Sequence, residues 1–200
     1  MILQEVQTEA DKKAFLQVAV DLYQEEKNWI RPLDKDIDGI FNPEVNKLFK
    51  QGGKARRWLL REGDRYIGRI AAFVHPKWKE KQPTGGVGFF ECIQDQKAAF
   101  LLLDTAKDWL EAEGMEAMDG PVNFGERDKW WGLLVKAFPR LIITCLGISL
   151  TIKSSLKPMA SKSISSNSPT CVPFRVWAST LRWWSALIKF VEIPPFSFAI

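Results

Sequence analysis

The N-terminal part of the 200-residue chain carries regular patterns of apolar and polar residues that predict a strand and then a helix. The segment ILQEVQ alternates apolar and polar side chains, as a half-buried strand does. Thr8 follows at a natural N-cap position, with acidic residues in the next turn. We expect a helix from there to about Glu26. Its apolar face consists of Phe15, Val18, Ala19 and Leu22.

The middle of the chain predicts a loop region and then a β-hairpin. The segment NWIRPLDKDIDGIFNPEVNKLF is typical of a loop with one short helix, capped by Asn42 with Pro43 at its first position. ARRWLLREGDRYIGRIAAFVHP predicts two strands joined by a turn at Glu62–Asp64. The second strand is apolar on both faces near its end, which favours a central place in a sheet. Gly68 inside this strand indicates a bulge or the close approach of another backbone.

The next segments predict a buried strand, a helix and one more short strand. These are PTGGVGFFECI, QDQKAAFLLLDTAKDWLEAEG and MEAMDGPVNF. Gly114 is well placed to end the helix. The apolar stripe of the helix is Leu102, Ala106, Trp109 and Leu110. The order β-α-(α)-β-β-β-α-β predicts an α/β (α+β) fold, a mixed sheet with helices packed on it.

Serine and charge are distributed unevenly, with a change near residue 138. All eleven serines lie after Phe138. Residues 1–138 contain 21 Lys+Arg and 23 Asp+Glu, whereas residues 139–200 contain 7 and 1. The formal net charge of +4 therefore comes from the last part alone. It is poor support for nucleic-acid binding, because the first part has no basic face or stacking-aromatic motif.

Other features exclude several classes of protein. The three cysteines, at positions 92, 145 and 171, show neither a CxxC motif nor a ligand spacing, so we predict no metal site and no disulfide framework. No stretch reaches the roughly 18 apolar residues of a membrane span. The N-terminal segment MILQEVQTEADKK passes quickly into charged residues and is not typical of a signal peptide. We expect a cytoplasmic protein without nucleic-acid or membrane partners.

Three segments in order, REGDRYIGRIAAFV, GVGFFECI and LLLDTAKDWLEAEGMEAM, resemble the GNAT superfamily of acyl-CoA N-acyltransferases. More narrowly, MDGPVNFGERDKWWGLLV is similar to a bacterial GNAT-like group of longer chains, mostly without an assigned substrate. The resemblance covers nearly all of residues 1–138, which we assign to a partial GNAT-like domain. It implies transfer of an acyl group from acetyl-CoA or another acyl-CoA to a small-molecule amine of unknown identity, without a metal.

The resemblance also implies a site. Members of the superfamily place a Q/R-x-x-G-x-G/A turn before this helix, and its N–H groups hold the CoA pyrophosphate. Here the run is QDQKAA, in which Lys97 stands at the first glycine position and either meets a phosphate or is simply solvated. Glu91 lies on the strand that lines the acceptor site and is the candidate base, with a plain strand-end charge as the alternative. The implied CoA-binding residues are Cys92, Ile93, Gln94, Gln96, Lys97, Ala98 and Ala99.

The position of Lys97 and the lack of a clear base leave a second function open, a non-catalytic GNAT-fold binding or scaffold protein. Acetyl-CoA titration separates this from an enzyme, because an enzyme must bind its donor.

The C-terminal part departs from the superfamily pattern. Its Tyr-x-x-x-Gly-Phe type ending is absent, and SSLKPMASKSISSNSPTCVPF stands in its place. If each codon is read one base downstream, the single codon of Met159 forces glycine at Ala160, and permitted codons give KLFEAYGFQVYFKQFTYLRP. We therefore predict a frame change near Phe138 to Arg140. Residues 139–200 are then an out-of-frame tail without a reliable fold, and the transferase is truncated and inactive. A genuine basic, Ser-rich disordered tail is the alternative.

Overall fold

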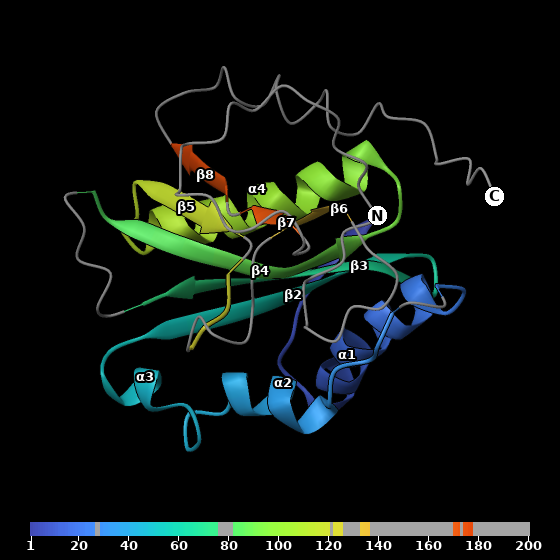
Figure 1. Cartoon of the computed structure of the whole chain (residues 1–200), viewed down its shortest axis with the longest axis horizontal. Helices are drawn as coiled ribbons and strands as arrows, with labels where there is room; N and C mark the ends of the chain where they lie inside the picture. Colours follow the sequence, from blue (N-terminus) through green and yellow to red (C-terminus); the bar gives the residue numbers. More distant parts are fainter. Residues whose placement is uncertain are drawn as a thin grey trace.

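The computed structural model describes residues 1–26, 29–75, 82–120 and 122–125, together with the backbone of three short strands at 133–136, 170–172 and 174–177 (Figure 1). The elements in chain order are β1 (Ile2–Glu5), α1 (Glu9–Tyr23), α2 (Asp34–Phe41), α3 (Lys47–Lys50), β2 (Lys54–Glu62), β3 (Arg65–Val74), β4 (Thr84–Cys92), α4 (Gln96–Ala112), β5 (Ala117–Gly120), β6 (Leu133–Lys136), β7 (Thr170–Val172) and β8 (Phe174–Trp177).

A mixed sheet with the strand order β1-β2-β3-β4-β5-β8 forms the centre of the fold. The pairs β1–β2, β2–β3 and β3–β4 are antiparallel. Strands β4 and β5 pair in parallel, and α4 connects them. Strand β8 pairs antiparallel with β5, and β6 and β7 form a separate two-stranded sheet. Helices α1 to α3 cover one face and α4 covers the other (Figure 1). The mixed sheet flanked by helices confirms the predicted fold class.

Two separate hydrophobic clusters hold these layers together, one on each face of the sheet. The first packs α4 on β2, β3 and β4 and includes Leu102 and Trp58, whose ring meets Trp109 edge to face at 5.9 Å. The second packs α1 and α2 on the opposite face and is centred on Phe15 and Phe73. Full burial of each such side chain stabilises the fold by roughly 1.5–3 kcal/mol. The sheet is therefore fixed from both sides.

Helix α1 begins where the sequence predicts. The Thr8 side chain accepts a hydrogen bond from the Asp11 N–H, and the Asp11 carboxylate accepts one from the Thr8 N–H, which together make a capping box. The helix ends at Tyr23, slightly before the predicted Glu26. Of the predicted apolar face, Phe15, Val18 and Ala19 are buried and Leu22 is partly buried.

The prediction for the segment after α1 was wrong. Instead of a helix beginning at Pro43, α2 ends at Phe41 and Asn42 follows as its C-cap. The reason is that Ile37, Ile40 and Phe41 share one helical face and pack into the second cluster. The Asn42 side chain accepts from the Glu44 N–H in a turn, and Asn46 caps the short helix α3.

The hairpin and its central strand are confirmed. Strands β2 and β3 are joined at Gly63 and Asp64, and β3 lies between β2 and β4. Gly68 serves both expected purposes. The β2–β3 register shifts next to it, between the pairs Leu60–Gly68 and Arg61–Tyr66, and a Cβ at Gly68 would lie 3.1 Å from the backbone oxygen of Glu91. The β3–β4 approach therefore requires glycine there.

Helix α4 also follows its sequence pattern. The four residues of the predicted stripe are buried against the sheet, and Gly114 ends the helical region with φ of +83°. The predicted domain boundary at residue 138 and the predicted lack of structure in 139–200 lie outside the described residues, apart from the backbone of β7 and β8. Both remain predictions.

Candidate functional site

Strand β4 is irregular just before it turns toward α4. Ala71 of β3 faces Gly88 and Arg69 faces Glu91, so two residues of β4 stand opposite the single residue between them. Phe89, one of these two, has φ of +51°, and it is the one non-glycine residue with positive φ in the described part of the chain. A bulge of this kind bends a strand and redirects its side chains, and such strained positions occur often at functional sites.

Strand β5 leaves β4 at the same point. The two strands pair in parallel over Thr84–Gly86, and the Val122 N–H then donates to the Val87 C=O at 2.8 Å. The segment crosses directly over Gly88, where an added Cβ would lie 2.1 Å from the Val122 carbonyl oxygen. Beyond Val87, the described part of the chain places no strand on this edge of β4. The last residues of β4 are therefore paired on one side.

The open edge presents backbone groups of Cys92. On the other side, β4 stays paired with β3, and the Ile93 N–H donates to the Ile67 C=O at 2.9 Å. Hydrogen-bonding direction alternates along an antiparallel strand, so the N–H and C=O of Cys92 face the open edge. An extended molecule that carries amide groups can bind there as an added strand does.

The first turn of α4 follows this edge and contains the other predicted CoA-binding residues. Asp95 is the N-cap, and its Oδ1 accepts hydrogen bonds from the Lys97 N–H at 2.6 Å and the Ala98 N–H at 3.2 Å. The Ala99 N–H donates to the Asp95 C=O at 3.0 Å. Gln94 and Lys97 are exposed, whereas Ala98 and Ala99 are buried in the core. The structure thus brings the predicted residues together around an aspartate that the prediction did not include.

A pyrophosphate does not fit this turn as it stands. It would need the N–H groups of Lys97 and Ala98, which already donate to the Asp95 carboxylate. The carboxylate also places a negative charge where a phosphate oxygen would lie, and like charges at short range repel. Every position from Gln94 to Ala99 carries a Cβ, so glycine-like access to the backbone is missing.

Glu91, the predicted base, lies in a buried ion pair. Its Oε2 accepts from the Nε of Arg69, and the two side chains are only 4% and 3% exposed. Arg69 also donates to the Phe15 C=O and lies over the ring of Phe89, 5.8 Å from its centroid. The pair ties β3, β4 and α1 together. The role of Glu91 as a base stays a prediction, since the carboxylate can serve structure alone.

Two weak acids near this ion pair are held in their neutral forms. Burial raises the pKa of Tyr23 well above its ordinary value, and the charge of Glu91 adds to this effect. The Tyr23 ring stacks on Trp29 at 5.4 Å. Burial, with the charges of Asp95 and Glu91, raises the pKa of Cys92 to about 12. Cys92 is therefore a packed thiol rather than a nucleophile, as its sequence context indicates.

Asn123 is a candidate that the sequence analysis missed. It follows Val122, which crosses Gly88, and it is 6% exposed. Its Oδ1 has no hydrogen-bond partner among the described residues, although a buried polar atom usually has one. The signal in the sequence was weak, because PVNF is typical of any strand end that enters a loop.

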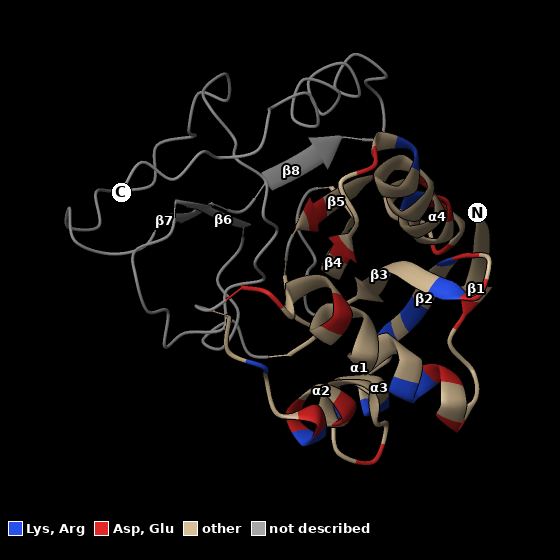
Figure 2. Ribbon diagram, turned by 90° about the vertical axis from the view of Figure 1, so that its right-hand side faces the viewer, with Lys and Arg blue, Asp and Glu red and all other residues tan. Residues whose placement is uncertain are grey.

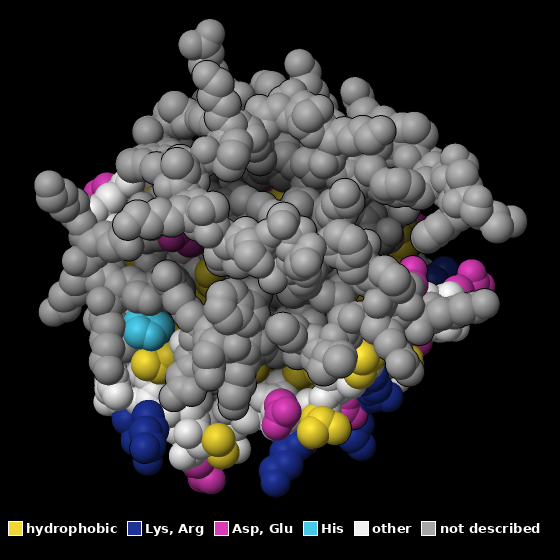
Figure 3. Space-filling model, viewed as in Figure 1, with side chains coloured by type: hydrophobic (Ala, Val, Ile, Leu, Met, Phe, Trp, Pro, Cys, Tyr) yellow, Lys and Arg dark blue, Asp and Glu magenta, His cyan; other side chains and the backbone are white. Residues whose placement is uncertain are grey.

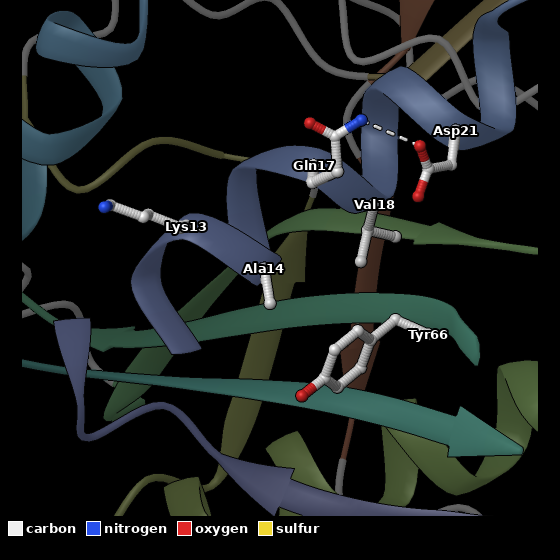
Figure 4. A pocket seen from close by; sticks show the side chains of 6 residues that line it. All are labelled: Lys13, Ala14, Gln17, Val18, Asp21 and Tyr66. Carbon is white, nitrogen blue, oxygen red and sulfur yellow. Dashed lines mark hydrogen bonds between the residues drawn. The ribbon is translucent and has the colours of Figure 1, made fainter. Parts of the chain in front are cut away.

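A shallow pocket of about 350 Å³ lies elsewhere, between α1 and the start of β3 (Figure 4). Gln17 donates to Asp21 at 2.8 Å along one side of it. Its lining residues are Lys13, Ala14, Gln17, Val18, Asp21 and Tyr66. None of the predicted site residues belongs to this pocket.

Charges of both signs are mixed over the outer helices. Figure 2 shows Lys and Arg beside Asp and Glu on α1, α2 and α4. Along the α2–α3 edge, apolar side chains lie between charged ones (Figure 3). Ile30, Leu33 and Val45 are more than half exposed. Within the described ranges, no group of three or more His, Cys, Asp or Glu could hold a metal, and no helix has the length and apolar character to cross a membrane.

No protein-family model matches the chain. It is 30% identical over 136 residues to a bacterial ceramide synthase from Caulobacter vibrioides, which covers 66% of this chain and 35% of the relative. It is 27% identical over 133 residues to protein YghO from Escherichia coli, which covers 64% and 33%. The chain thus spans about a third of the length of these curated relatives.

Two solved structures match part of the chain. An acetyltransferase of the GNAT family from Staphylococcus aureus matches with a TM-score of 0.43 and 16% identity, over 62% of this chain and 74% of its own. An aminoglycoside 6'-N-acetyltransferase complexed with coenzyme A matches with a TM-score of 0.42 and 13% identity, over 60% of each chain. These neighbours are GNAT acetyltransferases.

Proposed function

We propose that residues 1–138 belong to an N-acyltransferase that moves an acyl group from a thioester to a primary amine. The observation that carries this proposal is the open edge at the end of β4. There the bulge at Phe89 and the departure of β5 at Val87 leave the Cys92 N–H and C=O without a strand partner in the described part of the chain. An amide-bearing pantetheine arm is the type of extended ligand that this edge suits.

The proposed reaction is a direct transfer that needs no covalent intermediate on the protein. The amine nitrogen attacks the thioester carbonyl, the new C–N bond forms as the C–S bond breaks, and the proton lost by the amine balances the thiolate that leaves. A backbone N–H at the open edge polarises the carbonyl oxygen as negative charge develops on it. Glu91 is our candidate for receiving the amine proton, on the carboxylate oxygen that does not bind Arg69.

The acceptor we propose is a long-chain amine. The relative from Caulobacter vibrioides is named a ceramide synthase, and a ceramide is the N-acyl derivative of a long-chain amino alcohol. The segment between α1 and α2 offers apolar surface for such a chain. Ile30 is 61% exposed and Leu33 is 69% exposed, and both follow the stacked pair of Tyr23 and Trp29.

The test is a coupled measurement of thiol release and amide formation. The frame-restored chain is incubated with palmitoyl-CoA or palmitoyl-pantetheine and with sphinganine, with the 200-residue chain as the truncated control, and the N-acyl product is identified by mass spectrometry. We expect product formation that depends on both substrates. Binding of thioesters without any product would point to the non-catalytic binding protein instead, and the absence of both binding and product would refute the proposal.

We also propose that the in-frame part of the chain ends near Phe138. The two curated relatives match 66% and 64% of the chain, a share similar in size to residues 1–138. Resequencing the codons for Val135 to Arg140 tests the idea. A one-base correction that opens a frame through Tyr-Gly-Phe is the expected result, and an unchanged sequence would contradict a sequencing error. If the one-base correction is found, the activity test is made with the longer, frame-restored chain.

A further inference from the structure

The first turn of α4 is already occupied by an anion of the chain itself. The Asp95 Oδ1 receives the N–H groups of Lys97 and Ala98, and the Ala99 N–H donates to the Asp95 C=O. Of the first four N–H groups of the helix, only that of Gln96 has no partner among the described residues. An aspartate N-cap uses the same donors and the same helix dipole that a phosphate would use.

A phosphate group of an acyl-CoA donor must therefore displace the Asp95 carboxylate before it binds to this turn. Rotating the carboxylate away removes the cap from α4, and leaving it in place sets two anions against each other. Lys97, which is exposed, is the one cation within this turn, and one surface ammonium offsets little of that repulsion. By contrast, the Cys92 edge needs no rearrangement to accept amide groups.

We propose that Asp95 closes this turn to phosphate, so that the acyl donor is recognised through its pantetheine arm and not through a nucleotide. The proposal rests on the N-acyltransferase function given above and specifies its donor. The shared chemistry is an acyl thioester on a pantetheine arm. Such an arm occurs on free CoA, on a carrier protein or as pantetheine itself, and Asp95 makes the nucleotide part of CoA unnecessary for binding.

The experiment compares binding of CoA and of pantetheine by isothermal titration calorimetry, with no amine present. For the unchanged chain we expect dissociation constants within about threefold of each other. Asp95→Gly removes the carboxylate but keeps an acceptable N-cap, since glycine costs only a few tenths of a kcal/mol there. This variant should bind CoA at least tenfold more tightly, whereas its dissociation constant for pantetheine should be unchanged. Asp104→Asn, which removes an exposed charge farther along α4, should change neither constant and controls for net charge.

Each outcome decides the proposal. A preference for CoA over pantetheine above about threefold in the unchanged chain would overturn it, and so would an Asp95→Gly variant that binds CoA no better. The absence of binding of either compound at millimolar concentration overturns both the donor assignment and the transferase function. Turnover with palmitoyl-CoA and palmitoyl-pantetheine at similar kcat/KM supports both. The expected binding pattern without turnover supports the role of Asp95 and contradicts catalysis. A third donor, a palmitoylated acyl carrier protein, distinguishes the carrier from the free arm.

Discussion

Replacing Glu91 with glutamine should destabilise the protein strongly. The substitution keeps the size of the side chain but removes the charge that neutralises Arg69. Arg69 would keep the Phe15 C=O as an acceptor and its place over the rings of Phe15 and Phe89, but it would remain a buried cation without a counter-charge. Arg69 is 2% exposed, so water cannot solvate its uncompensated charge.

The magnitude follows from the burial of both partners. Removing one partner of a buried ion pair costs about 3–5 kcal/mol, and we expect the lower end because glutamine still offers an acceptor. Typical domains have a free energy of unfolding of roughly 5–15 kcal/mol, so this loss is a large fraction of the total. The double variant Arg69→Met/Glu91→Leu should restore most of it, because apolar replacement of both partners is often neutral or stabilising.

Urea unfolding followed by tryptophan fluorescence measures the effect. With a slope of about 2 kcal/mol per molar urea, the midpoint of Glu91→Gln should fall by roughly 1.5 M. Glu113→Gln is the control, because its partner Lys54 is 58% exposed and surface pairs contribute under about 1 kcal/mol. A loss no larger than in this control, or a double variant as unstable as the single one, would refute the reasoning. If the 200-residue chain aggregates, the same series is measured in the frame-restored chain.

Two further predictions concern the neighbourhood of the open edge. Gly88→Ala should cost about 2–3 kcal/mol or more, because the new Cβ would lie 2.1 Å from the Val122 carbonyl oxygen, whereas Gly39→Ala should change the free energy of unfolding by less than about 1 kcal/mol. Urea unfolding distinguishes them, and equal effects would contradict the crossing over Gly88. Because burial raises the pKa of Cys92 from 9.0 to about 12, its thiol stays protonated in the folded protein at pH 9, where an unfolded cysteine is half ionised. Iodoacetamide at pH 9 should therefore label the Cys92 peptide at least tenfold more slowly in buffer than in urea, and equal labelling rates by mass spectrometry would show that the thiol is accessible and ionised.

The sequence by itself determined the elements whose signals are local. The capping box at Thr8 and the stripe of α4 depend on residues three or four positions apart, and such neighbours act before any tertiary contact forms. The turn at Gly63 is local in the same way. Asp95 is also a local N-cap signal, but the predicted site did not include it, because the glycine pattern of the superfamily aligns with Lys97.

The tertiary structure alone decided how the site is built. Glu91 meets Arg69, 22 residues away, and Arg69 meets the Phe15 carbonyl, 54 residues away. The bulge at Phe89 and the crossing at Gly88 depend on the β3–β4 register and on where β5 departs, which no local pattern encodes. Residues far apart in sequence acquire their partners only when the sheet closes, because packing and long-range pairing, and not local propensity, set those contacts.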